Sequence, residues 1–481
     1  IGDWSSDVCS SDLGDTLVAY GTLKLGNADA FTTSATVTIS TDAILDVAGY
    51  SASKAIQLAA GGFVTTSTGT GGALTGGISL IPGAALTVLG NGVTVSPSGI
   101  LSAAPGAILT VGSGAISGNG IGVASGTSTN TGQVIFTGSN TYSGVTTIGY
   151  GNLKIANANA LAATNSVLIE INGTLDVAGY SISKAVTMHG GIATSSAGNN
   201  GALTGGITLT GNAKLTAATG ATFTIGTSSV TGTGYGLTIG DLNNTGTVVL
   251  SGANTYTGDT TISFGTLAIA NATGLGTIAG GTTIGFGATL DLQNVIVGAE
   301  ALTMNGGTLK TSTGTSSLSG GVTFGSSANS ISVSGTQLTL SGTVSSSGPY
   351  GFTFSSGTGT GTLVLSGTNT YSGLTRLNSG YLSITSADNI NGGVGGLTLA
   401  GGKLKTDGDI TLNPALILVA GTNSMFYANS GTLTINSSIA ATTGGLTIAN
   451  GAPGTVVLGG SNAFTGDVNI YSKLKLANVN A

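Results

Sequence analysis

The stretch that decides the fold is GTVVLSGANTYTGDTTISFGTLAIAN, residues 246–271. Within it, TVVLS, TTIS and TLAIA are short runs of β-branched and aliphatic residues, separated by Gly, Asn and Ser. In TLAIA, Leu267 and Ile269 flank Ala268, so the two larger side chains lie on one face of a strand. Gly at this frequency disfavours helices, at about 1 kcal/mol per site. The stretch predicts short strands joined by tight turns.

This pattern recurs along the chain. Further copies lie near residues 132–157, 361–386 and 454–478, and a half copy lies near 14–31. Between them, LDVAGYS occurs at residues 45–51 and again at 175–181. Repeats of this kind bury their apolar faces against their neighbours, so the sequence predicts a solenoid.

Three architectures can be built from many short strands. A β-sandwich closes at about 100 residues and does not extend by repetition. An outer-membrane barrel needs strands of about ten residues and aromatic girdles, whereas aromatic residues make up 5% of this chain. Gly and Asn suit the corners of coils, because they tolerate left-handed backbone conformations. We therefore predict an all-β, right-handed parallel β-helix, elongated, with about twenty residues per turn and a rise of about 4.8 Å.

Composition narrows the functional classes. The 481 residues include 86 Gly, 6% are charged and 40% are hydrophobic, which is too apolar for a disordered linker. The longest apolar run, ALILVA at residues 415–420, is much shorter than the roughly 18 residues of a membrane-spanning helix. The net charge of −6 and the absence of a basic run give no support for nucleic-acid binding.

The first residues differ in character from the rest. Residues 3–13 read DWSSDVCSSDL, which matches the in-frame translation of a common sequencing adapter. This segment contains Trp4 and Cys9, the single Trp and the single Cys of the chain. We expect residues 1–13 to be an adapter-derived artefact and residues 14–481 to be the β-helix.

The repeat consensus LxLSGxNTYTGxTxIxxGTLxLxN resembles the autotransporter-associated β-strand repeat, also called the passenger-associated transport repeat. In the copy at 246–271, the matching residues are Leu250, Ser251, Gly252, Asn254, Thr255, Tyr256, Thr257, Gly258, Thr260, Ile262, Gly265, Thr266, Leu267 and Asn271. The last copy has Phe464 in place of Tyr and Ser472-Lys473 in place of Gly-Thr, which puts its local turn in doubt.

The resemblance implies the passenger of a type V secretion protein of a Gram-negative bacterium, located at the cell surface, anchored to the outer membrane or secreted. It implies two partners, a C-terminal β-barrel translocator and the outer-membrane assembly machinery. Neither a barrel nor a signal peptide is recognisable in the sequence, so we expect residues 14–481 to be a passenger fragment.

Groups able to support catalysis are sparse. His189 is the single His, which rules out a His-based metal cluster in this sequence. Asp46, Asp176 and Asp291 recur in LDV or LDL, far apart in sequence, and we interpret them as solvated positions or a recurrent corner rather than a carboxylate pair.

One charge cluster is dense. It consists of Lys403, Lys405, Asp407 and Asp409, which we expect to form a solvated patch with Lys–Asp pairing across a turn. We therefore predict no catalytic, cofactor-binding or metal-ligating residues, and no cofactor.

The clearest signature is an Asn followed two residues later by an aromatic residue. We interpret it as a corner Asn and an aromatic ring that packs on the next turn; the alternative is ligand binding or recognition by secretion machinery. The residues are Asn140, Asn254, Asn369 and Asn462, with Tyr142, Tyr256, Tyr371 and Phe464.

These features favour a non-catalytic surface stalk that supports secretion and adhesion, with a host or surface glycan or protein as receptor. The alternative is a β-helical extracellular enzyme acting on polysaccharide. A lyase needs basic groups, and Arg376 is the single Arg. A third hypothesis is a surface of aligned Thr that binds ice or a glycan, which requires a flat row of Thr on successive turns.

Overall fold

The computed structural model describes most of the chain from residue 14 onward. The described residues are 14–28, 30–31, 36–54, 56–59, 62–65, 67, 72–74, 78–81, 98–101, 105–106, 108–111, 116–117, 122–126, 128, 131–198, 201–413, 415–449 and 453–478. The segment that we expect to be adapter-derived, residues 1–13, lies outside them.

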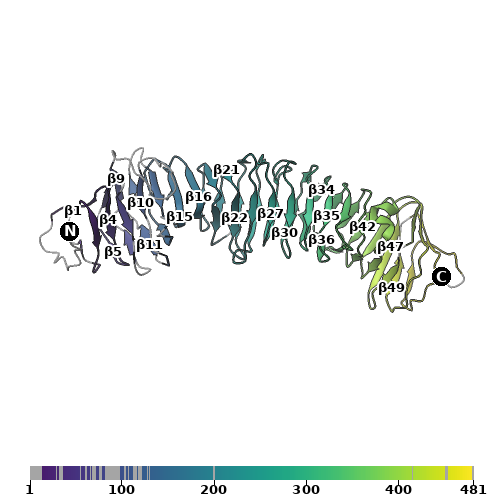
Figure 1. The fold of residues 1–481 in the computed structure, drawn as a ribbon. Helices are drawn as coiled ribbons and strands as arrows, with labels where there is room; N and C mark the ends of the chain where they lie inside the picture. Colours follow the sequence, from purple (N-terminus) through teal and green to yellow (C-terminus); the bar gives the residue numbers. More distant parts are fainter. Residues whose placement is uncertain are drawn as a thin grey trace. The chain divides into compact units, whose positions relative to one another are not determined.

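The chain divides into two compact units. One comprises residues 1–238 and 243–248, and the other comprises residues 239–242 and 249–481. In each unit, short strands pair in parallel with the strands of the next coil (Figure 1). The predictions of an all-β fold and of parallel stacked coils are confirmed.

The strands of the first unit are short, with two exceptions of ten residues. They are β1 (Thr16–Val18), β2 (Gly21–Lys24), β3 (Val37–Ile39), β4 (Ala43–Asp46), β5 (Ser51–Ala52), β6 (Ile56–Ala59), β7 (Phe63–Thr65), β8 (Gly72–Leu74), β9 (Ile78–Ile81), β10 (Ser98–Leu101), β11 (Ile108–Val111), β12 (Ile116–Ser117), β13 (Gly122–Ser125), β14 (Gln133–Phe136), β15 (Thr146–Ile155), β16 (Val167–Asp176), β17 (Ser181–Ile182), β18 (Val186–His189), β19 (Ile192–Ser195), β20 (Gly201–Leu203), β21 (Ile207–Gly211), β22 (Ala213–Ala217), β23 (Thr222–Ile225) and β24 (Val230–Thr231). Two strands fall where the units divide, β25 (Leu237–Ile239) and β26 (Thr247–Leu250).

The second unit contains further strands and one short helix. They are β27 (Thr260–Ile262), β28 (Thr266–Ile269), β29 (Thr282–Ile284), β30 (Thr289–Gln293), β31 (Ile296–Val297), β32 (Leu302–Met304), β33 (Thr308–Thr313), β34 (Thr315–Leu318), β35 (Val322–Phe324), β36 (Asn329–Val333), β37 (Gln337–Leu340), β38 (Val344–Ser346), β39 (Phe352–Ser355), β40 (Thr362–Leu365), β41 (Thr375–Leu377), β42 (Tyr381–Ile384), η1 (Ala387–Gly393), β43 (Leu397–Leu399), β44 (Lys403–Thr406), β45 (Ile410–Leu412), β46 (Leu416–Leu418), β47 (Asn423–Ala428), β48 (Thr432–Ile435), β49 (Gly445–Ile448), β50 (Thr455–Leu458), β51 (Val468–Ile470) and β52 (Lys473–Leu476).

The strand register fixes the length of a coil. Thr260 of β27 pairs with Thr282 of β29, Thr282 pairs with Leu302 of β32, and Leu302 pairs with Val322 of β35. Neighbouring coils are therefore offset by about twenty residues, as the sequence predicts.

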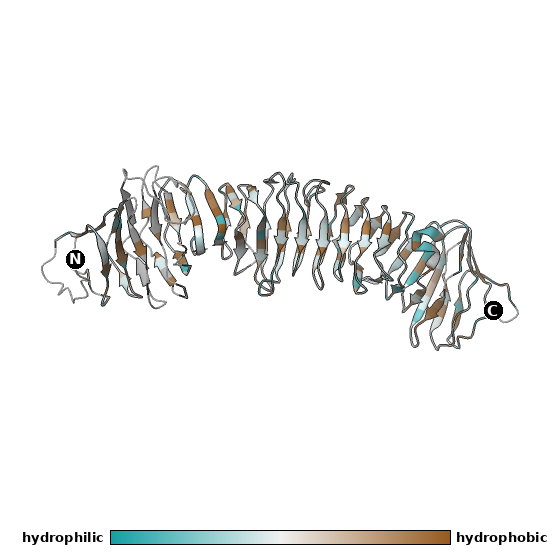
Figure 2. Cartoon of the chain, viewed as in Figure 1, coloured by the Kyte–Doolittle hydropathy of each residue, from teal (hydrophilic) through white to brown (hydrophobic). Residues whose placement is uncertain are grey.

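The core is built by alternation along each strand. In β40, Leu363 and Leu365 are buried, while Thr362 and Val364 are half-buried on the outer face. Figure 2 shows this alternation as hydrophobic and hydrophilic residues following one another along the strands. Because apolar side chains from every coil point inward, each coil covers the core of the next.

Two local features differ from the sequence expectations. The 3-10 helix η1 has no periodic apolar pattern; Ser386 caps it and the side chain of Asn389 accepts hydrogen bonds from the backbone N–H groups of Thr385 and Ser386. Side-chain capping alone thus forms the turn. The coil of the last repeat also closes despite Ser472-Lys473, because β51 pairs with β49 and β52 with β50.

Candidate functional site

The repeat-signature Asn side chains lie at coil corners and connect neighbouring coils. Asn140 is buried; its Oδ1 accepts the backbone N–H of Ile116 at 2.9 Å, and its Nδ2 donates to the carbonyl of Ala160 at 2.9 Å. Ile116 belongs to the preceding coil and Ala160 to the following one, so one amide spans three coils.

The other copies repeat this contact. Asn369 Oδ1 accepts the N–H of Val344 at 2.7 Å, and its Nδ2 donates to the carbonyl of Asn389 in η1. Asn254 Nδ2 donates to the carbonyl of Gly274 at 2.7 Å. We call each such Asn side chain with its backbone partners an Asn clip. Because a buried amide and a buried carbonyl are costly when unpaired, the clip explains why this corner needs Asn.

Each clip is accompanied by a fully buried tyrosine. The hydroxyl of Tyr142 lies 2.5 Å from Thr146 Oγ1, and the corresponding oxygen–oxygen distance is 2.7 Å in the next two repeats. Those two pairs are Tyr256 with Thr260 and Tyr371 with Thr375. Burial raises the pKa of each tyrosine above its ordinary value, so the phenols stay neutral.

The last repeat loses both members of this pair together. Phe464 replaces Tyr, and Val468 stands where the other repeats have Thr. A phenol without its partner, or a buried hydroxyl without the phenol, would carry an unmatched polar group. This paired replacement was readable in the sequence and is a signal that Tyr and Thr contact each other.

The structural interpretation of the signature also accounts for the ring. Tyr371 packs edge-on against Phe324 and Phe352, with ring centroids 5.8 and 5.7 Å away. Such edge-to-face contacts between aromatic rings are favourable. Within the described coils, the Asn and Tyr side chains are therefore occupied by the fold itself.

The recurrent Asp residues occupy buried corners. Asp176 Oδ1 accepts the N–H groups of Ala178 and Ser196, both at 2.9 Å, and Lys154 Nζ lies 4.0 Å from its Oδ2. The equivalent partners of Asp46 are Ala48, Ser67 and Lys24. Asp291 is likewise buried. The corner interpretation is right for these residues, and the solvated one is wrong.

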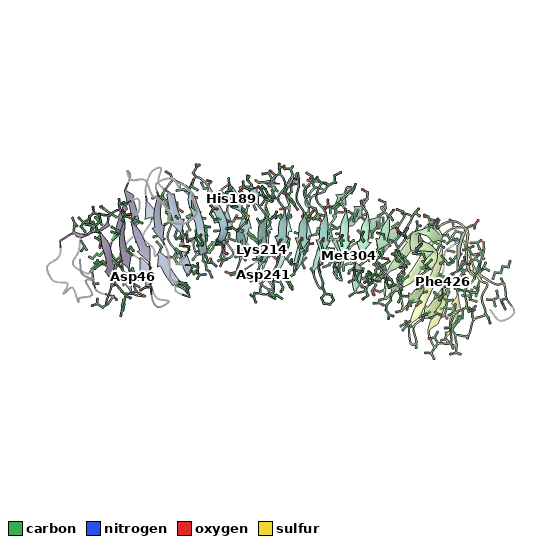
Figure 3. The ribbon with its side chains drawn as sticks, in the orientation of Figure 1. Asp46, His189, Lys214, Asp241, Met304 and Phe426 are labelled. Carbon is green, nitrogen blue, oxygen red and sulfur yellow. The ribbon has the colours of Figure 1, made fainter. Side chains whose placement is uncertain are left out.

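His189 ends strand β18 and is half-exposed (Figure 3). Its Nδ1 lies 3.4 Å from Oε2 of Glu170 on the preceding coil. A search of the described residues finds no group of three or more His, Cys, Asp or Glu that could hold a metal ion.

The charge cluster at 403–409 is arranged differently from our prediction. Lys403 Nζ lies 4.4 Å from the ring centroid of Tyr381, and Lys405 Nζ lies 5.9 Å from that of Tyr427. Each lysine thus covers an aromatic ring on a neighbouring coil, a cation–π contact, and the predicted Lys–Asp ion pairing is not found among the described residues.

The aspartates of this cluster bind the next coil instead. Asp407 accepts hydrogen bonds from Ser430 and Asn429, which lower the pKa of its carboxyl, and Asp409 Oδ1 accepts the N–H of Thr432 at 2.8 Å. Because Asp407 ionises readily, it is a poor general acid.

Glu300 is a titratable residue that the sequence interpretation missed. It is 3% exposed and accepts a hydrogen bond from Thr282 Oγ1 at 2.8 Å. Burial raises the pKa of Glu300 to about 7, the hydrogen bond opposes this rise, and the charge of Asp259 adds to it. No spacing in the sequence marks this corner, because the coil fold alone buries the carboxyl.

The described part of the chain contains no helix that is long and apolar enough to cross a membrane. Taken with the coil geometry, the clips define a class of protein: a parallel β-solenoid whose repeats stitch coils together.

Comparison with known proteins identifies the family. The Passenger-associated-transport-repeat family matches residues 127–155, 243–269, 358–384 and 453–472. The chain is also similar to the "Adhesin BmaC autotransporter" of Brucella suis biovar 1 (strain 1330), with 31% identity over 342 residues. That alignment covers 67% of this chain and 9% of the Brucella protein. No solved structure matches.

The chain is an autotransporter passenger-associated repeat protein. Its location is the cell surface or outer membrane of a Gram-negative bacterium. The Asn clips lie at the centre of the matched segments, so the family signature coincides with the contacts between coils.

Proposed function

We propose that this chain is a non-catalytic passenger stalk that supports secretion and displays an adhesive surface. The observation that carries the proposal is that the repeat-signature residues are used up in coil-to-coil contacts, as in the clip of Asn140 with Ile116 and Ala160. A repeat whose invariant chemistry joins coils provides length and surface rather than a reaction centre. The similarity to an adhesin autotransporter supports adhesion.

The proposed partners follow from the same class. They are a C-terminal β-barrel translocator, the outer-membrane assembly machinery, and a host or surface glycan or protein receptor. We further propose that residues 1–13 are an adapter artefact and that the passenger fragment occupies 14–481.

Adhesion is tested with beads coated with the purified chain. We expect them to attach to host-cell or biofilm surfaces more than beads coated with the heat-unfolded chain. Equal attachment of the two would contradict the adhesive part of the proposal.

The enzyme alternative has one observation in its favour, the raised pKa of Glu300 beside the charged Asp259. Two carboxyl groups with separated pKa values are typical of acid–base sites. However, Glu300 is 3% exposed and bonded to Thr282, so a polymeric substrate has no access to its carboxyl.

Purified chain is therefore expected to give no turnover of polysaccharide, peptide or ester substrates above buffer. Turnover that disappears in Glu300→Gln, or in Asp407→Asn at the exposed charge cluster, would establish the enzyme alternative. Asp241→Asn serves as the control for a carboxylate outside both places.

A further inference from the structure

A row of hydroxyl side chains crosses five successive coils of the second unit. The strands β27, β29, β32, β35 and β38 pair in sequence, and the middle residue of each strand pairs with the middle residue of the next. These residues, which we call the threonine row, are Thr261, Thr283, Thr303, Thr323 and Ser345.

Every side chain of the threonine row is half-exposed, because its two strand neighbours point into the core. Thr323 Oγ1 lies 3.3 Å from Ser345 Oγ. Among the residues that the structure describes, the hydroxyls of Thr261, Thr283 and Thr303 have no hydrogen-bond partner. Parallel strands repeat at about 4.8 Å, so the row offers open hydroxyl groups at that spacing.

The surface beside the row is small and uncharged. On one side of the Thr residues of β29, β32 and β35 stand Gly281, Ala301 and Gly321, and on the other stand Gly285, Asn305 and Gly325. No side chain at these positions carries charge or bulk, so an extended chain can lie along the row without meeting a steric or electrostatic barrier.

An aromatic ring borders the row at one corner. Phe286 follows Thr283 by three residues and is 76% exposed. Its ring lies against Gly306 of the next coil, where a Cβ atom would come 2.8 Å from Phe286 Cδ2. The glycine thus leaves room for the ring at this corner, with one face of the ring open to solvent.

We propose that the threonine row with Phe286 binds an extended neutral polysaccharide. Sugar hydroxyls both donate and accept hydrogen bonds, as the threonine hydroxyls do, and the apolar face of one sugar packs on the exposed ring. The lack of charge along the row favours a neutral glycan over an acidic one, since an acidic polymer would find no cation there. This inference rests on the proposed adhesive function and names the chemistry of its ligand.

A second row of hydroxyls provides the matched control. Thr289 and Thr308 stand on β30 and β33, on the same two coils as Thr283 and Thr303 and on the other side of the Phe286 corner. That face carries Lys310 beside Thr308, and its strands contain the buried Asp291. It is therefore less suited to a neutral chain.

The test is affinity electrophoresis of the full chain through gels containing soluble neutral β-glucan or alginate, an acidic polysaccharide. We expect retardation by the neutral glucan and none by alginate. Phe286→Ala and the double variant Thr283→Val with Thr303→Val should each weaken retardation roughly tenfold. Thr289→Val with Thr308→Val should leave it unchanged, as should 1 M salt.

Circular dichroism and thermal unfolding of every variant check that the fold is intact. Retardation by alginate alone, equal loss in the two double variants, or binding to ice with none to glucan would each overturn the inference. If the glucan has no effect while coated beads still adhere, the inference fails and the proposed adhesive function stands.

Discussion

At the scale of single residues, the Asn clip is the contact that most clearly links sequence to architecture. Asn140 satisfies one backbone donor and one backbone acceptor that lie on different coils, 24 residues before it and 20 residues after it. An aliphatic residue of similar size would leave both backbone groups buried and unpaired.

We predict that Asn140→Ala lowers the free energy of unfolding by about 2–4 kcal/mol, because an N–H and a carbonyl lose their partner in the core. Chemical denaturation measures the loss. The control is Asn172→Ala, an exposed residue, which should change stability by less than about 0.5 kcal/mol. Similar losses in the two variants would show that the clip contributes nothing specific.

Glu300 makes stability depend on pH. Its pKa is raised from 4.5 to about 7 in the fold, so the folded state holds a proton that the unfolded chain releases. The associated stability is complete below about pH 4.5, falls as the pH rises through about 7, and is absent above it.

We predict that unfolding free energy drops by about 2 kcal/mol across this window, allowing for solvent screening. Glu300→Gln, which stays neutral, should flatten the drop and should be the more stable form at pH 8. Thermal unfolding between pH 4 and 8 tests both statements; an unchanged pH slope in the variant would assign the titration elsewhere.

At the scale of elements, the coils approach one another most closely at corner glycines. Gly342 lies above Gly320, and a Cβ on Gly342 would stand 2.2 Å from the carbonyl oxygen of Gly320. Gly367 repeats this contact one coil further on, with a Cβ 2.3 Å from the carbonyl oxygen of Gly342. Glycine is required here by close approach of backbones rather than by its backbone conformation.

We predict that Gly342→Ala destabilises the chain by more than about 2 kcal/mol, because the backbone of the adjacent coil has to move. Gly298→Ala is the control, since a Cβ at that position has no atom within 4 Å. The difference between the two melting temperatures measures the strain, and equal values would mean that the corner yields without cost.

At the scale of the whole molecule, stability in a solenoid is close to a sum of coil and neighbour contributions. A lesion in one coil should therefore loosen the neighbouring coils and leave remote ones unchanged. In the Gly342→Ala variant, hydrogen exchange is expected to rise in β35, β38 and β40 and to stay at the wild-type rate in β16 to β22. An increase along the entire chain would indicate one cooperative unit instead.

The sequence by itself determined the coil. Alternation in TLAIA, the copies of the repeat and the Gly-rich corners predict stacked parallel strands, because each is a local property with a fixed period. The Asn–Tyr signature also indicated a corner with a packed ring, although its partners in other coils could not be identified from spacing alone.

Only the tertiary structure decided which residues meet across coils. Strand register places Thr261, Thr283 and Thr303 in one row, although their spacings in the sequence are uneven. It also turns Lys403 and Lys405 onto tyrosine rings, where sequence proximity had suggested aspartates. The physical reason is that a coil of about twenty residues brings together side chains that are remote in sequence, and a change of one or two residues in a corner selects a different neighbour.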